Sequence, residues 1–337
     1  MTNPREEHQG MPLDIVRRKA VNDLNEMIFD GHIKLQRNHE CFCGSQDFTR
    51  LSRLDRYGLP FGTQICRSCG LISQTTSISE ESLGIFYDEI YWPLNHGDAK
   101  NNSYATDIGA LEFSKFITPE IRKRFRKSIK IMEIGCGQGD KFSYLRRALE
   151  VDYDVTALGC DYSNEAILAA KRNGIDVSQG GIEVLLDKGP ADVVILSHVF
   201  EHVVDLRKFL DQIEGISHEG TLVYVEVPGV IDLKNKPEYE YDYQDYCVVA
   251  HIHNFSLSTL VNVFASRNFF ALKGTEFVRL IVSKSGDKLA LASPNPYSEI
   301  IEALSLADEK HVKWLAKYKN PVRKYFVNIA KAVLGRI

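Results

Sequence analysis

The sequence predicts an α/β protein built on a doubly wound parallel sheet, and three features of its middle third predict it. From Ile131 onward, apolar runs of strand length alternate with helical patterns, the order that a parallel sheet requires. The run at 191–196 is apolar at every position except Asp192, as expected of a strand that helices cover on both faces. Between the first strand and its helix, three alternate glycines turn the chain, and ligands of open α/β sheets bind at such bends.

The order of the predicted elements follows from these patterns. Strands are expected at 130–134, 155–160, 175–182, 191–196 and 221–227, with helices at 141–150, 165–173 and 206–213. Beyond them, segments 269–283 and 288–292 are expected to form an antiparallel hairpin at one edge.

An acidic residue follows the bend at a useful distance. Asp161 ends the second strand about 20 residues beyond the glycines, where a parallel βαβ unit places an acid that holds ribose hydroxyls. Capping of the next helix by Asp161 is the alternative, and both roles can hold at once.

The bend itself, Glu133-Ile134-Gly135-Cys136-Gly137-Gln138-Gly139, resembles motif I of class I S-adenosylmethionine (SAM) methyltransferases, E/D-x-G-x-G-x-G. The stretch 197–203 is similar to the xxLEH stretch after strand four of many small-molecule methyltransferases. The resemblance implies a Rossmann-like sheet of seven strands. For SAM it implies a binding site made by Glu133, Gly135, Gly137, Gly139, Asp161, Tyr162, Ile182 and Ser197. Two tyrosines shortly before Pro93, Tyr87 and Tyr91, are further candidates for this site, although aromatic residues more often pack in the core.

Two cysteine pairs in the first quarter predict a small metal-binding lobe. Cys41 and Cys43 are followed by glycine, as are Cys66 and Cys69 about 20 residues later, which matches the plan of a zinc ribbon. Four thiolates would close a tetrahedral structural zinc site. The first pair is C-x-C, so His39 is an alternative ligand, and a metal-free lobe with buried thiols is the other interpretation.

The segment after the fifth strand is expected to cover the site. Residues 231–250 interleave acids with tyrosines. This pattern favours a lid whose tyrosines stack on a bound sugar, and a solvated acidic loop is the alternative. The next residues resemble the x-E-H-x-x-x-F/L-S pattern of sugar methyltransferases, in which the last histidine lies close to the acceptor. That position is His253, and Ile252 stands where the glutamate is usual. We expect the general base to be His253, with His251 and His198 behind it. His202 is expected to pair with Glu201 beneath the site.

As a whole, the chain resembles methyltransferases with an N-terminal zinc-ribbon lobe from bacterial sugar, lipopolysaccharide and secondary-metabolite pathways. The expected reaction is O-methylation of a sugar, nucleotide-linked or glycan-attached. C-methylation of a nucleotide-linked keto-deoxysugar and a non-catalytic SAM-fold scaffold are the alternatives. The expected parts are a helical segment and zinc lobe (1–92), a methyltransferase domain (93–292) and a helical tail (293–337).

Composition narrows the remaining classes. The 337 residues are 44% hydrophobic with a formal net charge of −4, which gives no support to a nucleic-acid binder. We expect a cytoplasmic protein, monomeric or homodimeric, because the N-terminus is polar and the cysteine pairs suit a reducing compartment. In the tail, Val322–Leu334 forms an apolar stripe with basic residues on the other face. Packing within the protein or on a second subunit is the expectation, with peripheral membrane contact as the alternative.

Overall fold

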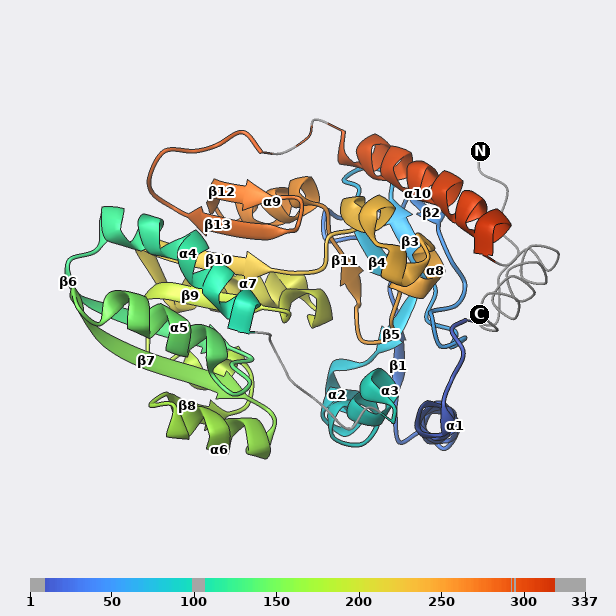
Figure 1. Cartoon of the computed structure of the whole chain (residues 1–337), viewed down its shortest axis with the longest axis horizontal. Coiled ribbons are helices and arrows are strands. Elements are labelled where there is room, and N and C mark those ends of the chain that lie inside the picture. Colours follow the sequence, from blue (N-terminus) through green and yellow to red (C-terminus); the bar gives the residue numbers. More distant parts are fainter. Residues whose placement is uncertain (1–9, 99–106, 292, 294, 319–337) are drawn as a thin grey trace, which may run out of the picture.

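A seven-stranded sheet forms the centre of the larger part of the molecule (Figure 1). The structure is a computed structural model, and it describes residues 10–98, 107–291, 293 and 295–318. The strand order is β12-β13-β10-β9-β6-β7-β8. The five strands from β10 to β8 in this order are parallel to one another, and β13 is antiparallel to β10. The strands are β6 (Lys127–Ile134), β7 (Tyr153–Asp161), β8 (Asp176–Gln179), β9 (Ala191–Ser197), β10 (Ser217–Glu226), β12 (Phe270–Thr275) and β13 (Arg279–Ser283).

Helices cover both faces of this sheet, as the mainly apolar run of β9 predicts. Val193 and Ile195 pack into one core and Val194 and Leu196 into the other, because successive strand residues point to opposite faces. The first core is completed by α4 (Asp107–Arg124), α5 (Asp140–Leu149) and α6 (Asn164–Arg172). The second is completed by α7 (Leu206–Gly215) and α9 (Leu257–Ala265). The α/β fold with a mostly parallel sheet is confirmed.

A smaller lobe carries two further sheets. Its four-stranded sheet has the order β11-β4-β3-β2, and its other sheet pairs β1 with β5. The strands are β1 (Leu35–Arg37), β2 (Phe48–Arg50), β3 (Thr63–Cys66), β4 (Ile72–Gln74), β5 (Thr76–Ile78) and β11 (His253–Asn254). The helices of this part are α1 (Ile15–Phe29), η1 (Glu80–Ser82), α2 (Leu83–Ile85), η2 (Phe86–Tyr91) and α3 (Trp92–His96).

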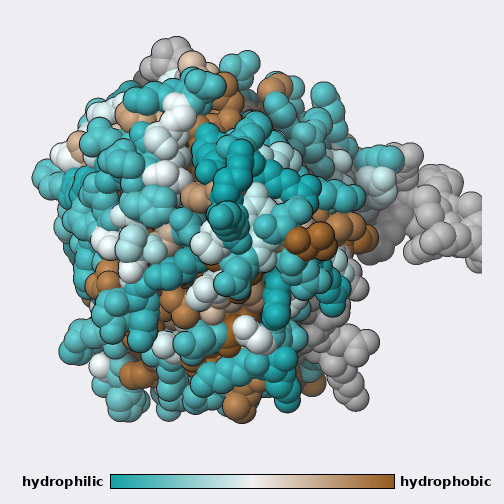
Figure 2. All heavy atoms as spheres, turned by 90° about the vertical axis from the view of Figure 1, so that its left-hand side faces the viewer, coloured by the Kyte–Doolittle hydropathy of each residue, from teal (hydrophilic) through white to brown (hydrophobic). Residues whose placement is uncertain are grey.

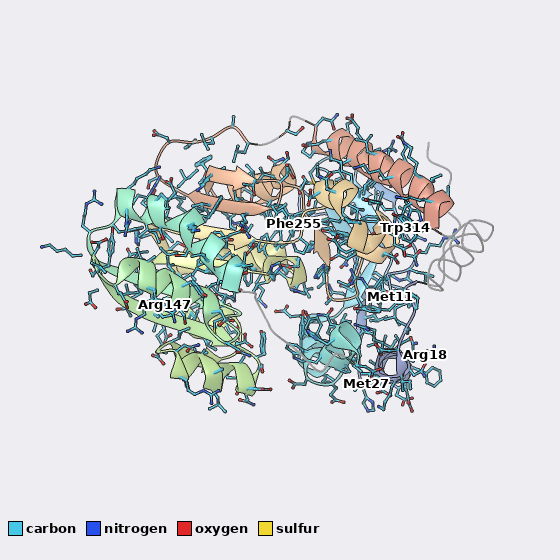
Figure 3. All side chains as sticks on the ribbon, viewed as in Figure 1. Met11, Arg18, Met27, Arg147, Phe255 and Trp314 are labelled. Atoms are coloured by element: carbon cyan, nitrogen blue, oxygen red, sulfur yellow. The ribbon has the colours of Figure 1, made fainter. Side chains whose placement is uncertain are left out.

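The late strand β11 ties the lobe to the large sheet. It pairs antiparallel with β4, although it follows β4 by almost 180 residues in the chain. The next residue, Phe255, is fully buried and stacks on Phe200 with ring centroids 5.5 Å apart. Figure 3 shows Phe255 between the two groups of strands. The domain boundaries at residues 92 and 292 stay a prediction. Across the first of them, β11 of the predicted methyltransferase domain is a strand of the lobe's sheet.

The segment expected to form a lid is packed rather than loose. It contains η5 (Ile231–Asn235), η6 (Pro237–Tyr239) and the short helix α8 (Tyr243–Tyr246). Tyr243 and Tyr246 are buried in one core with Ile65 and Ile72 of the lobe. The buried carboxylate of Asp242 accepts from the backbone N–H of Gln244 at 2.6 Å, so it caps α8 instead of facing solvent.

Two further differences concern the end of the chain. Residues 288–291 form no strand, so the edge hairpin consists of β12 and β13. The helix α10 (Pro296–Tyr318) packs on η5 and α8. The apolar stripe Val322–Leu334 lies outside the described residues, and its proposed membrane contact stays a prediction. No helix of the described chain has the length and apolar character needed to cross a bilayer. The face shown in Figure 2 is largely hydrophilic with scattered apolar groups.

Candidate functional site

The glycine-rich bend lies between the end of β6 and the start of α5. Gly135, Gly137 and Gly139 all have positive φ, at 63°, 52° and 80°, which explains why glycine stands at each alternate position. A Cβ on Gly135 would approach Val199 to 2.6 Å, and one on Gly139 would approach Ile175 to 2.2 Å. A Cβ on Gly137 would meet no described atom within 4 Å. The backbone is therefore closely packed at two glycines and open at the middle one.

This difference gives a first testable prediction. Gly139→Ala is expected to lower the free energy of unfolding by about 2–4 kcal/mol, because strain and a clash with Ile175 add together. Gly137→Ala is expected to cost only the backbone strain, about 1–2 kcal/mol. Its added methyl group would occupy the open space, so SAM affinity should fall at least about tenfold. Urea unfolding and calorimetric titration measure the two effects, and equal SAM affinity in Gly137→Ala and the wild type would contradict the assignment.

Asp161 lies at the carboxyl end of β7, beside the bend. Its Oδ2 accepts from the N–H of Gly137 at 2.9 Å, and its Oδ1 accepts from the N–H of Ser163 at 2.9 Å. Ser163, not Asp161, is the N-cap of α6. An ionised carboxylate offers about four acceptor positions, so Asp161 keeps capacity for a ligand after these two bonds.

The other residues predicted to bind the cofactor lie in different settings. Glu133 is buried behind the bend, and burial raises its pKa to about 8. Ile182 is buried, whereas Tyr162 is 58% exposed next to Asp161. The Ser197 hydroxyl donates to Glu226 at 3.3 Å. Tyr162 can therefore contact a ligand directly, whereas the Glu133 side chain is buried away from solvent.

Glu201 lies in the segment directly after β9, and three histidines surround it. Val199 packs on Gly135, so this segment adjoins the bend. Glu201 is 2% exposed and lies in η4 (Phe200–His202). Its Oε1 is 3.3 Å from Nδ1 of His198 and 3.9 Å from Nε2 of His202. Burial alone would raise the pKa of Glu201, but the nearby His202 and His198 outweigh burial and lower it to about 2.

His251 completes this group from a distant segment. Its ring lies 5.0 Å from that of His202 between centroids, and burial lowers its pKa to about 3. Tyr87 and Tyr91, both on η2, approach the His202 ring with centroid distances of 6.1 and 6.4 Å. The structure thus brings together two of the predicted catalytic histidines and the two predicted tyrosines.

His253, the first candidate for the base, lies elsewhere. It is buried on β11, which packs against η4, and burial lowers its pKa to about 4. It does not belong to the group around Glu201, so its catalytic role stays a prediction without a contact to support it.

Sequence reasoning missed a charged group on the same edge of the sheet. The carboxylate of Glu226, at the end of β10, pairs with Lys141, the second residue of α5. It also accepts from Nε of Arg279 at 2.8 Å. Burial works against the charged form of Glu226, but these cations lower its pKa to about 2. The position of Lys141 directly after the bend was the available signal; Glu226 and Arg279 offered none.

The four paired cysteines meet in the lobe. The Sγ atoms of Cys41 and Cys69 are 3.4 Å apart, those of Cys43 and Cys66 are 3.6 Å apart, and all four lie within 4.8 Å of one another. Gly44 and Gly70 have φ of 86° and 77°, as expected of the turns that follow each pair. Four sulfurs in this arrangement fit tetrahedral Zn²⁺, and His39 is exposed and outside the cluster. The set is suited to a closed structural site.

The strand order, the bend and the acid beside it define a class of fold. A parallel sheet whose last pair is an antiparallel hairpin, with a glycine bend after its central strand, is the class I SAM-dependent methyltransferase fold.

Comparisons with known proteins agree with this class. Residues 111–273 match the family model described as a methyltransferase domain. The trans-aconitate 2-methyltransferase of Mycobacterium ulcerans (strain Agy99) is 27% identical over 104 residues. These are 31% of this chain and 38% of that protein, so the chain spans well under half of this relative's length.

Solved structures with bound S-adenosylhomocysteine (SAH) are also similar. The plantazolicin methyltransferase BpumL, with a pentazolic desmethylPZN analogue and SAH, has a TM-score of 0.46 and 16% identity, covering 68% of this chain and 89% of its own. The magnesium protoporphyrin IX methyltransferase ChlM of Synechocystis PCC 6803 with SAH has a TM-score of 0.42 and 14% identity, covering 61% and 100%.

Proposed function

We propose that the protein is a SAM-dependent methyltransferase that methylates a hydroxyl group of a sugar-containing acceptor. The observation that carries the proposal is a contact between the glycine-rich bend and the segment after β9. Val199 packs on Gly135, so the segment that holds His198 and His202 borders the bend. Adenosine would lie along the bend with its ribose on Asp161, and Tyr162 and Ser197 would border it. The matching methyltransferase domain supports the reaction class. The proposal that the acceptor contains a sugar depends on the resemblance of the segment that ends at Ser256 to sugar methyltransferases.

Bound SAM supplies an electrophilic methyl group on its sulfonium. The protein must align the acceptor oxygen with that group, and positioning of this kind contributes about 7–11 kcal/mol in favourable cases. A neutral hydroxyl is a poor nucleophile, so a base that takes its proton assists the transfer.

We assign this base to His198, among the histidines that the sequence suggested. Its side chain is 57% exposed, whereas those of His251 and His253 are half-buried and buried. Nδ1 donates to Glu201 at 3.3 Å, which leaves the lone pair of Nε2 for an acceptor proton. The residue has φ of 55°, a strained conformation for a non-glycine residue that is common at functional sites.

The substitution His198→Asn tests this assignment. Asparagine tolerates positive φ, so the fold should be kept, but its amide cannot accept the proton. We expect kcat to fall about 100-fold or more while the Kd for SAM changes less than about twofold. Mass gain on a panel of nucleotide sugars, with NMR of the product, measures turnover and identifies the methylated atom.

The matched control is His218→Asn. His218 lies at the start of β10, at the opposite end of that strand from Glu226, and its ring is hydrogen-bonded to Asp192. Its replacement should leave kcat unchanged. If His198→Asn turns over as fast as this control, His198 is not the base. If the wild type binds no SAM, the proposed methyl transfer is wrong and the non-catalytic scaffold is favoured.

A further inference from the structure

The buried carboxylate of Glu201 has an incomplete set of partners. Its Oε1 faces His198 and His202, but its Oε2 has no hydrogen-bond partner among the described residues, although the side chain is 2% exposed. An ionised carboxylate in the interior needs compensation at both oxygens. The position at Oε2 therefore calls for a donor or a cation.

Two imidazole rings face this carboxylate with nitrogen atoms. One ligand atom from each of Glu201, His202 and His251 lies within 4.8 Å of the other two. Nδ1 of His202 is 2.8 Å from the carbonyl oxygen of Ala250, and because a carbonyl only accepts, Nδ1 carries the hydrogen. The lone pair of His202 is therefore on Nε2, which faces Glu201. A backbone carbonyl behind the ring is the arrangement that orients histidine ligands of metals.

We propose that Glu201, His202 and His251 bind one divalent transition-metal ion. Two neutral imidazoles and one carboxylate suit zinc, cobalt, manganese or iron(II). Tetrahedral coordination at ordinary bond lengths sets neighbouring ligand atoms about 3.4 Å apart, so modest side-chain rotations close the site. Burial and the neighbouring His202 keep the pKa of His251 low, which leaves its ring neutral and ready to bind.

This site differs in kind from the cysteine cluster. Four thiolates close a tetrahedron, whereas three nitrogen and oxygen ligands leave a position open. The rings of Tyr87 and Tyr91 lie next to the His202 ring, so aromatic side chains border the proposed ligands. Where the proposed methyl transfer holds, the open position takes a hydroxyl oxygen of the acceptor, and the ion lowers the pKa of that hydroxyl next to His198.

The test is metal binding by the full-length protein, which does not depend on activity. Protein with zinc in the cysteine cluster is dialysed against a mild chelator and titrated with Co²⁺, by calorimetry and by visible absorption. We expect one Co²⁺ per chain with weak d–d bands and no intense thiolate-to-metal band, because the ligands are nitrogen and oxygen. Binding of no Co²⁺, or a new thiolate band as the only signal, would overturn the proposal.

Two conservative variants and a control locate the ion. Glu201→Gln and His251→Gln are expected to lose the Co²⁺ equivalent and keep the zinc, whose retention reports that the lobe is folded. His218→Gln, at a histidine outside the group, should bind Co²⁺ as the wild type does. Undiminished binding in both variants would place the ion elsewhere and reject the site.

A measurement on the wild type covers the case in which the variants do not fold. Proton NMR of the Co²⁺-loaded protein should show two paramagnetically shifted signals that vanish in D₂O, one from the N–H of each ligating imidazole. Fewer than two such signals would contradict ligation by both His202 and His251.

Discussion

Replacing Asp161 by alanine is expected to weaken SAM binding about 100-fold. A carboxylate that accepts from two ribose hydroxyls makes two charge-assisted hydrogen bonds, and their loss amounts to about 2.7 kcal/mol. The substitution also removes the acceptor for the N–H of Gly137, so the bend itself loses support. Calorimetric titration with SAM and with SAH measures the effect, and both ligands should weaken equally because they share the ribose.

A variant on the same strand separates this effect from general damage to the sheet. Asp154 is exposed near the start of β7, at the opposite edge from the bend. Asp154→Ala should leave the SAM affinity unchanged. Should the affinity of Asp161→Ala fall no more than that of Asp154→Ala, the ribose is held by other groups and the proposed orientation of the cofactor is wrong.

Removing one sulfur from the cysteine cluster is expected to unfold the lobe at a much lower temperature. Cys66 is fully buried on β3, in the middle of the four-stranded sheet. Cys66→Ser should abolish tight zinc binding, because binding of a structural zinc ion is part of the folding free energy. With ~2–4 °C lost per kcal/mol, we expect a fall in Tm of roughly 10 °C or more.

The control keeps the chemistry of the change but moves it away from the cluster. Cys247 is a buried thiol that does not belong to the four, so Cys247→Ser should keep one zinc per chain by elemental analysis. Calorimetry should show a smaller loss of Tm than in Cys66→Ser. Full zinc content and wild-type Tm in Cys66→Ser would show that the lobe folds without the ion.

The features that the sequence predicts well are local ones. A mainly apolar run such as 191–196 and glycines at alternate positions depend on their own backbone conformation. The structure has the strand there, and the three glycines that turn the chain have positive φ. The cysteine pairs are local in the same sense, because each needs only its own turn to bring two sulfurs together. The parallel sheet and the position of Asp161 follow from these signals.

The features that the sequence hides depend on contacts between distant segments. His251 meets His202 across almost 50 residues, and no spacing rule connects them. The strand β11 has two residues, too few to show alternation. The tyrosines of segment 231–250 suggested a lid because acids alternate with them. In the structure, the acid Asp242 faces Gln244 and His311, which lets Tyr243 turn into the core.

The pairing of β11 with β4 has a consequence for dissecting the protein. A fragment that begins after residue 107 would keep all seven strands of the large sheet but present β11 with open hydrogen-bonding groups and no neighbour. A fragment that stops before residue 99 would lack the outermost strand of its own sheet. The lobe is thus no detachable module. If the two pieces were expressed separately, each would expose a strand edge with unpaired backbone groups. Exchanging the lobe between relatives would require exchanging residues 253–254 along with it.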